Sequence, residues 1–285
     1  LRISILSYFF ANFATMEFRT IVHFPRPAFE LMPCERILFV GSCFADSMGR
    51  RFQEEKFRAV VNPSGVMYNP VSILHTVEKM EKHVFDTAVF TLGTNHVYVE
   101  RTTGEIVDNC RKRPQRLFEE RELTVEECTG ALHESVLLLR KNNPGIKVIL
   151  TVSPIRYAKY GYHGSRLSKA VLLLAADRLV KELGETAYYF PAYEIVNDEL
   201  RDYRFYKPDM LHPSDQTVDY IWERLVEACF SAEAKVFLEA WRPVKAALGH
   251  RPFHPGSEAY RDFLEKTKEA ARTLKKKYPD MELNL

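Results

Sequence analysis

The sequence has few cysteines, and they show no pairing pattern. Five cysteines are scattered over 285 residues, and no two of them form a Cys-x-x-Cys pair. An odd, scattered set of this kind fits neither a disulfide framework nor a zinc site. We therefore expect reduced thiols in the cytoplasm, no metal site and no other cofactor.

The sequence also lacks an excess of charge and a long hydrophobic run. Its 40 basic and 38 acidic side chains leave a formal net charge of +2. This balance gives no electrostatic reason to expect a nucleic acid or an anionic membrane as a partner. No stretch approaches the roughly 20 consecutive apolar residues that span a bilayer. We expect a small molecule or a modest polymer as the ligand, and the sequence leaves the oligomeric state open.

The composition is that of an ordinary globular protein. Hydrophobic residues make up 46% of the chain and charged residues 27%, which excludes a disordered or fibrous protein. A chain of 285 residues can bury a large core, and it lies near the upper size limit of one α/β domain.

Residues 1–15 differ from the rest of the chain. They begin with Leu1 and carry one arginine followed by an apolar run that reaches Met16. The run is similar to the core of a signal peptide, but no Ala-x-Ala cleavage motif follows it. We expect translation to start at Met16, or residues 1–15 to be a disordered extension. Export through this segment is the alternative to a cytoplasmic location.

Five short apolar runs predict β-strands. Each run is continuous rather than alternating, as expected of a strand that is covered on both faces of a sheet. The runs cover residues 37–40, 59–61, 88–92, 148–152 and 188–190.

Amphipathic segments separate these runs. Thr124 and Glu127 form a capping box at the start of one predicted helix. Residues 167–183 predict another helix, which Gly184 ends, and Ser214 can cap a third. The alternation of strands and helices predicts a three-layer α/β/α fold around a parallel sheet of about five strands.

Two segments interrupt this alternation. Residues 97–99 and 105–107 flank a turn at residues 102–104, which predicts a hairpin inserted after the third strand. A link rich in proline, glycine and histidine precedes a last amphipathic helix. We therefore expect one main domain over residues 16–245 and a helical tail over residues 246–285 that packs on it.

Candidate catalytic side chains follow the predicted strands. In an open parallel sheet, the ligand site lies beyond the carboxyl ends of the strands. Ser42 and Cys43 follow the first strand, and Arg156 follows the fourth. Asp209 and His212 lie just before the helix that Ser214 can cap, so we expect nucleophile candidates and an Asp/His pair to meet at one edge.

The order of these motifs resembles the SGNH (GDSL-like) hydrolase superfamily. The string Gly-Ser-Cys-Phe-Ala at residues 41–45 spells the motif of the GSCFA family, a bacterial family within it. Residues 209–214, Asp-Met-Leu-His-Pro-Ser, are also similar to that family, and the resemblance covers roughly residues 17–240. It implies an SGNH/flavodoxin-like fold and an esterase that acts on an acyl ester, such as an O-acetylated carbohydrate.

The resemblance also implies roles for single residues. His212 would remove the proton of the nucleophile, and Asp209 would orient the imidazole. The backbone N–H groups of the nucleophile and of Gly65, together with the amide of Asn95, would stabilise the oxyanion. The further candidates for substrate contact are Gly93, Asn109, Arg156 and His163. Arg156 would either bind a substrate carboxylate or phosphate or tie two loops together.

The sequence leaves the nucleophile ambiguous. An ungapped match to the Gly-Asp-Ser motif of the superfamily places Cys43 on the nucleophilic serine, whereas a shift of one residue selects Ser42. The turn leads into a helix, whose N-terminal N–H groups favour a thiolate. We therefore favour Cys43 and keep Ser42 as the alternative.

Three functions fit these features. The first is an acyl-ester hydrolase, and the second is an acyltransferase on the same scaffold. The third is a catalytically inactive module that binds a ligand. A redox-sensing thiol at Cys43 is less consistent with the sequence, because no resolving cysteine lies nearby. A hydrogen bond between the nucleophile and His212 would favour catalysis over simple binding.

Overall fold

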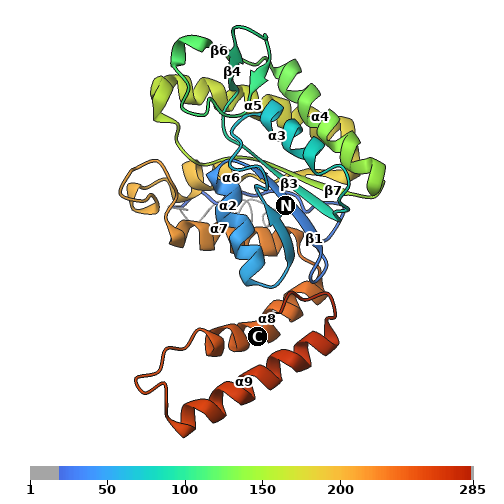
Figure 1. The fold of residues 1–285 in the computed structure, drawn as a ribbon, viewed down its shortest axis with the longest axis vertical. Helices are drawn as coiled ribbons and strands as arrows, with labels where there is room; N and C mark the ends of the chain where they lie inside the picture. Colours follow the sequence, from blue (N-terminus) through green and yellow to red (C-terminus); the bar gives the residue numbers. More distant parts are fainter. Residues whose placement is uncertain (1–18, 284–285) are drawn as a thin grey trace, which may run out of the picture.

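A computed structural model describes residues 19–283, so the expected extension over residues 1–15 lies outside the described part. A central sheet of five parallel strands lies between two layers of helices (Figure 1), in the order β2-β1-β3-β7-β8. The predicted apolar runs match these strands to within one residue at either end. The strands are β1 (Arg36–Gly41), β2 (Arg58–Val61), β3 (Thr87–Leu92), β7 (Lys147–Val152) and β8 (Ala187–Tyr189).

Neighbouring residues of each strand face opposite sides of this sheet. In β1, Ile37 and Phe39 are buried in one hydrophobic cluster, whereas Leu38 and Val40 are buried in the other. This alternation follows from the two-residue period of a strand. Because both faces are covered, both sets are apolar, and the run shows no alternation in the sequence.

The helices divide between the two faces (Figure 1). One face is covered by α2 (Cys43–Glu54) and α7 (Asp215–Cys229). The other is covered by α3 (Pro70–Lys79), α4 (Val125–Asn142) and α5 (Gly161–Leu183).

The predicted helix ends are confirmed. The capping box of Thr124 and Glu127 opens α4, with both of its hydrogen bonds present. Gly184, at a φ of 60°, ends α5, and the hydroxyl of Ser214 caps α7 by accepting from the backbone N–H of Thr217. Helix α5 begins at Gly161, earlier than the apolar pattern from residue 167 indicates.

The inserted hairpin is part of a three-stranded antiparallel sheet. Its strands are β4 (His96–Glu100), β5 (Ile106–Val107) and β6 (Phe118–Glu122), in the order β5-β4-β6. The hairpin prediction was therefore correct but incomplete. Only Phe118 of β6 is buried, and its other four residues are charged and exposed, so this strand carries no apolar signal.

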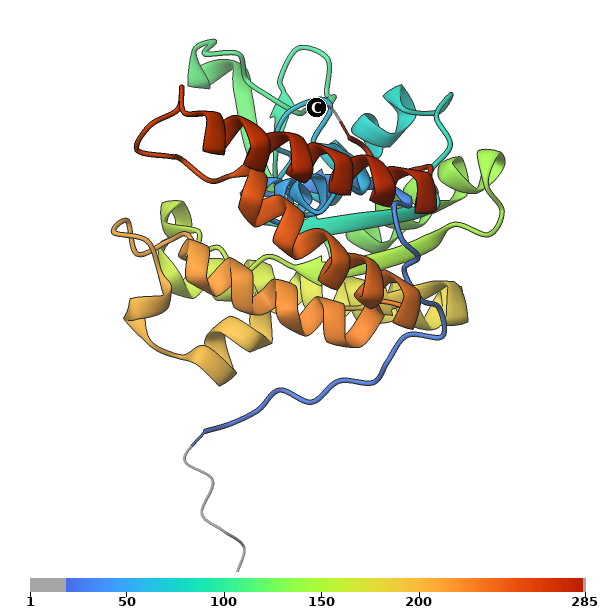
Figure 2. The same ribbon diagram turned by 90° about the horizontal axis from the view of Figure 1, so that it is seen from below.

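The C-terminal part forms a pair of helices, α8 (Ala232–Leu248) and α9 (Glu258–Lys277), outside the layer of α2 and α7 (Figures 1 and 2). The boundary expected at residues 245/246 falls inside α8. This helix is continuous from the cap at Ser231, and its apolar face belongs to the same cluster as Met281. Within residues 19–283, no helix combines the length and the apolar character needed to cross a membrane.

The strand order defines where a ligand site is expected. The order corresponds to the flavodoxin-like arrangement 2-1-3-4-5, in which ligands bind where the connections from neighbouring strands diverge to opposite faces. In this chain, β1 leads into α2 on one face, while β3 leads through the inserted sheet to α4 on the other. The crevice therefore lies beyond Gly41 and Leu92, where these two neighbouring strands end.

Candidate functional site

The turn after β1 requires glycine. Gly41 has a φ of 147°, and a Cβ atom there would lie 2.2 Å from the carbonyl oxygen of Thr91. The N–H of Gly41 donates to Oδ1 of Asn62 at 2.9 Å, and the N–H of Ser42 donates to the Thr91 carbonyl at 3.0 Å. The turn is thus attached to the ends of the neighbouring strands, which fixes the directions of the next two side chains.

The hydroxyl of Ser42 faces inward and has a structural role. The residue is only 1% exposed. Its Oγ accepts from the backbone N–H of Phe44 at 3.2 Å and lies 3.1 Å from Oγ1 of Thr91. Ser42 is therefore the N-cap of α2, and its hydroxyl is already engaged on both sides.

The thiol of Cys43 lies at the N-terminus of α2 and is partly exposed. The N–H groups of a first helical turn have no acceptor within the helix, so they can donate to an anionic group that forms beside this thiol. Cys34, Cys128 and Cys229 are buried, and burial raises the pKa of each of these thiols to about 12. Those three thiols are therefore unsuited to act as nucleophiles at neutral pH.

Tyr68 is a site residue that sequence reasoning missed. Its phenol oxygen lies 3.6 Å from Sγ of Cys43, and its carbonyl accepts from the N–H groups of Gly93 and Thr94. Burial raises the pKa of Tyr68, so the phenol stays protonated and can donate to a thiolate. The available signal was its position directly before Asn69, the N-cap of α3.

Asp209 and His212 form an oriented pair on the loop before α7. Oδ2 of Asp209 lies 2.6 Å from Nδ1 of His212, and Oδ1 accepts from the backbone N–H groups of Leu211 and His212. These backbone hydrogen bonds, followed by the one from the imidazole, lower the pKa of Asp209 to about 2. The carboxylate is therefore charged at neutral pH, and Nε2 of His212 is left as the basic ring nitrogen.

Arg156 ties this loop to the end of β7. Its backbone N–H donates to the carbonyl of Leu211 and its Nη1 to the carbonyl of Met210, both at 3.0 Å. The guanidinium also lies over the rings of Tyr162 and Tyr206. The loop-tying role predicted as one alternative for Arg156 is thus present in the structure.

A chain of contacts links the thiol to the histidine loop. Tyr157 follows Arg156, and its ring packs edge-on against that of Tyr68, with 5.9 Å between the centroids. Tyr68 in turn contacts the thiol of Cys43. Within residues 19–283 this phenol is the hydrogen-bond partner of the thiol, and no hydrogen bond joins Cys43 to His212.

The N–H groups of Gly65 and Gly93 are both engaged in hydrogen bonds within the fold. Gly65 has a φ of 92° and donates to the carbonyl of Asn62 at 2.8 Å, which closes a tight turn. Gly93 donates to the carbonyl of Tyr68, and a Cβ atom there would lie 2.8 Å from that oxygen. The N–H of Gly65, expected as an oxyanion donor, is therefore already used in this turn. At Gly93, the absence of a side chain lets the backbone approach that of Tyr68 closely.

The side chain of Asn95 is buried and hydrogen-bonded within the fold. The residue is 1% exposed, and its Nδ2 donates to the carbonyl of Leu123 at 2.8 Å. Its backbone N–H donates to the hydroxyl of Ser168. Asn95 therefore anchors the start of the inserted sheet. The side-chain amide, which was expected as an oxyanion donor, is thus hydrogen-bonded within the fold.

The remaining two candidates lie on exposed segments. Asn109 follows β5, and its Oδ1 accepts from the N–H of Arg111 in a local turn. His163 is exposed in the first turn of α5. In the described part of the chain, neither side chain is hydrogen-bonded to Cys43 or to His212. No three or more His, Cys, Asp or Glu side chains gather there as metal ligands.

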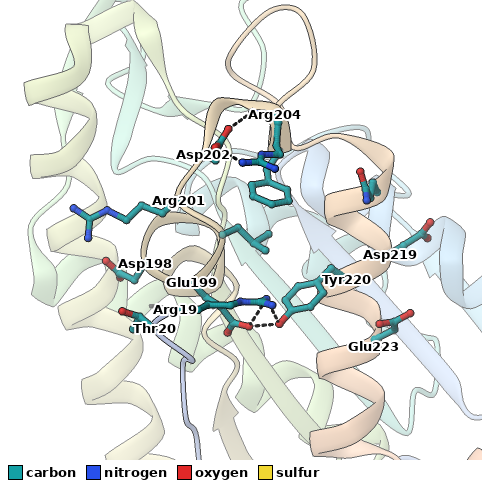
Figure 3. Close-up of a pocket in the computed structure, with 13 residues that line it drawn as sticks. Arg19, Thr20, Asp198, Glu199, Arg201, Asp202, Arg204, Asp219, Tyr220 and Glu223 are labelled. Carbon is teal, nitrogen blue, oxygen red and sulfur yellow. Dashed lines mark hydrogen bonds and ion pairs between the residues drawn. The ribbon is translucent and has the colours of Figure 1, made fainter. Parts of the chain in front are cut away.

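A cavity of about 740 Å³ lies away from these groups, between α7 and the π-helical segment Ile195–Leu200 (Figure 3). The carboxylate of Glu199 accepts hydrogen bonds there from Arg19 and Tyr220. The lining contains arginines and carboxylates but no serine, cysteine or histidine. This cavity therefore offers ion pairs rather than a nucleophile and a base.

Comparisons with known proteins agree on a family. The model of the GSCFA family matches residues 36–88 and 79–225, and that of the GSCFA domain protein, C-terminal domain, matches residues 241–285. No curated protein is detectably similar to the chain in sequence.

Solved structures with a similar fold include several esterases. An acetylxylan esterase from Geobacillus stearothermophilus is 14% identical, with a TM-score of 0.48, over 71% of this chain and 97% of the esterase. A carbohydrate esterase of family 3 from Talaromyces cellulolyticus is 11% identical, with a TM-score of 0.40, over 73% of this chain and 98% of its own.

Proposed function

The chain belongs to the GSCFA family, and from the geometry of its site we propose that it is an acyl-ester hydrolase of the SGNH type. In this proposal Cys43 is the nucleophile, His212 the base and Asp209 the group that orients the base. The main support for this proposal is the difference between the adjacent residues Ser42 and Cys43. The hydroxyl of Ser42 is buried and caps α2, whereas the thiol of Cys43 is partly exposed at the same helix terminus.

The reaction would proceed in two steps. In the first, His212 accepts the thiol proton, Sγ of Cys43 attacks the ester carbonyl carbon, and the bond to the alcohol oxygen breaks. The alcohol leaves with the proton from His212, and the acyl group remains as a thioester on Cys43. In the second step, His212 takes a proton from water, and the resulting attack releases the carboxylic acid and restores the thiol. Asp209 stabilises the imidazolium in both steps.

Two donors near the thiol would stabilise the oxyanion. The N–H of Cys43 is in the first turn of α2 and has no acceptor within the helix. The phenol of Tyr68 lies beside the thiol and is protonated at neutral pH. Such donors act where charge develops in the transition state. We propose these two in place of Gly65 and Asn95, whose donors are engaged elsewhere.

The substrate class and the cell compartment belong to the same proposal. The resemblance to SGNH hydrolases favours an O-acetylated carbohydrate or a related acyl ester. A thiol nucleophile favours a reducing compartment such as the cytoplasm, where a free cysteine is stable. An acyltransferase would use the same thioester with an alcohol in place of water.

One observation favours the inactive binding module instead. The thiol is hydrogen-bonded to Tyr68 and not to His212 within the described residues. Catalytic hydrogen bonds are often long or unformed in the absence of substrate, so this geometry is compatible with catalysis as well. The two functions are separated by experiment.

The test is hydrolysis of p-nitrophenyl acetate by the wild type and by Cys43→Ala and Ser42→Ala. We expect Cys43→Ala to lose at least roughly a thousandfold in kcat/KM, because the nucleophile is gone. We expect Ser42→Ala to keep most of the activity and to lose about 1 kcal/mol of stability, because a helix cap is removed.

Labelling with iodoacetamide supplies the control. Cys110, a half-buried thiol on a loop, is the matched control, and Cys110→Ser should leave the activity unchanged. Alkylation of Cys43 should inactivate the enzyme in step with label incorporation. Full activity of Cys43→Ala with loss of activity in Ser42→Ala would identify a serine enzyme. Absence of hydrolysis by the wild type would support the binding module.

A further inference from the structure

A small recess opens next to the loop that carries His212. Its volume is about 40 Å³, and Arg156, Ser165, Arg166 and Lys169 contribute to its lining. This space admits a small polar group of a few heavy atoms. That is the size of a carboxylate group.

Lys169 lines this recess from within α5, although it is buried. The residue is 3% exposed, and its Nζ donates to the carbonyl of Gly93 at 2.6 Å. Burial lowers the pKa of Lys169 to about 7. A buried ammonium is unfavourable unless an anion or several acceptors pair with it. In the part of the chain that the structure describes, this carbonyl is its hydrogen-bond partner, which leaves donor capacity unused.

The other two cations of the recess also lack carboxylate partners. Arg166 lies on α5 one turn before Lys169 and forms no ion pair with any described residue. Among the same residues, Arg156 is hydrogen-bonded only to backbone carbonyls. None of the residues that line the recess is acidic. Two guanidinium groups and the amine of Lys169 therefore line a space in which the described residues place no negative charge.

The recess shares Arg156, Arg166 and Asn197 with a wider groove of about 320 Å³. Tyrosine rings and two carboxylates, those of Asp198 and Asp202, also line this groove. Asp202 is already paired with Arg204 at 2.9 Å, outside the recess. The groove is large enough for the remainder of a small substrate, while the recess holds only its charged end.

We propose that the recess binds a carboxylate, and that the ester cleaved at this site carries that carboxylate in its acyl part. That the substrate is an ester rests on the proposed function. That it carries a carboxylate rests on the recess alone. A planar carboxylate can accept two parallel hydrogen bonds from a guanidinium, and a lysine adds a point charge. The volume favours this group over the larger phosphate.

The cations of the recess are connected to both halves of the candidate site. Arg156 donates to the two residues that precede His212. Lys169 donates to the carbonyl of Gly93, whose N–H donates to the carbonyl of Tyr68, the partner of the thiol. A carboxylate bound in the recess would therefore anchor the substrate beside the segments that hold the reacting groups.

The first experiment measures binding without catalysis. The full chain is titrated calorimetrically with succinate and, separately, with inorganic phosphate. We expect succinate to bind more tightly, and Arg166→Gln and Lys169→Met each to weaken it roughly tenfold, as for loss of one charged hydrogen bond. Arg178→Gln is the matched control, because Arg178 lies on the same helix but pairs with Glu126 and Glu182 outside the recess.

Equal binding by the wild type and Arg166→Gln would overturn the proposal, as would phosphate binding at least as tightly as succinate. Arg166 is exposed, so this variant should fold even if Lys169→Met does not.

The second experiment compares p-nitrophenyl hemisuccinate with p-nitrophenyl acetate. Arg166→Gln should lower kcat/KM roughly tenfold for the charged ester and leave the neutral ester unchanged. Arg166-dependent succinate binding without hydrolysis of either ester would overturn the proposed hydrolase but support the recess. Hydrolysis that depends on Cys43 but is insensitive to Arg166 for both esters would overturn the recess and leave the hydrolase intact.

Discussion

Residues 19–283 contain two hydrogen-bonded Asp–His pairs, and the two pairs differ in their surroundings. Nδ1 of His212 lies 2.6 Å from Asp209, and Nδ1 of His75 lies 2.8 Å from Asp108. The first pair lies on one loop with its residues three apart, and both side chains are about 40% exposed, at 38% and 44%. The second joins α3 to the end of the inserted sheet across 33 residues, with side chains 30% and 19% exposed.

The two pairs have the same chemical groups but different neighbours. In the Asp108 pair, Lys79 also approaches the carboxylate, so the group holds two elements together. In the Asp209 pair, backbone N–H groups hold the carboxylate, and the pair lies on the loop that Arg156 ties to the end of β7. A hydrogen-bonded pair of this kind can act as a base only where its ring faces a nucleophile.

The largest expected difference between the pairs is in catalysis. We expect His212→Asn to lower kcat/KM roughly a thousandfold, because the general base is removed. We expect His75→Asn to retain near wild-type kcat/KM, because its ring binds Asp108 and has no part in the proposed reaction. Kinetics with p-nitrophenyl acetate measures both. Comparable losses in the two variants would contradict the distinction, and so would full activity in His212→Asn.

Substitution of the two aspartates should produce an intermediate difference in catalysis between the pairs. Asp209→Asn can still accept the backbone hydrogen bonds, but its amide would stabilise the wrong tautomer of His212. We expect kcat to fall roughly a hundredfold, and Asp108→Asn to leave kcat unchanged. Because the pKa of Asp209 is about 2, titration of this carboxylate should not appear in the wild-type pH–rate profile near neutral pH. An unchanged kcat in Asp209→Asn would show that His212 needs no orienting partner.

The smallest effect is on stability and depends on pH. The hydrogen bond that Nδ1 of His75 donates to the carboxylate of Asp108 raises the pKa of His75 in the folded state. This contribution is fully present below the unfolded-state pKa of about 6.5 and is lost as the pH rises through the higher folded-state value. Asp108→Asn should therefore lower the free energy of unfolding by about 1 kcal/mol near pH 5.5 and by less near pH 8.5. Urea denaturation at both values tests this, and a larger loss at the higher pH would contradict it.

Local signals explain which parts of the fold could be predicted from the sequence. The five central strands are continuous apolar runs because both faces of the sheet are covered, and α4 is marked by its capping box. Strand β6 was not predicted, because four of its five residues are charged and exposed. Helix α8 was not predicted as a separate element, so the boundary of the tail was placed inside it.

Some residues of the candidate site could also be predicted from local sequence, and others could not. Asp209 and His212 were found because they lie on one loop, and their hydrogen bond is local. The choice between Ser42 and Cys43 depends on the φ of the preceding glycine and on neighbouring strands, which the sequence does not display. Tyr68 becomes visible as a site residue only when β1 and β3 are placed side by side.

The two hydrophobic clusters also differ in how soon during synthesis they can form. The buried members of the cluster beneath α3, α4 and α5 all lie between Leu38 and Ala187. The cluster on the opposite face extends from Leu31 to Met281. Once residue 190 has been synthesised, every buried residue of the first cluster is present. The second cluster is complete only after about 90 further residues have been added. The nascent protein must keep one side of its sheet unfinished until α9 has emerged.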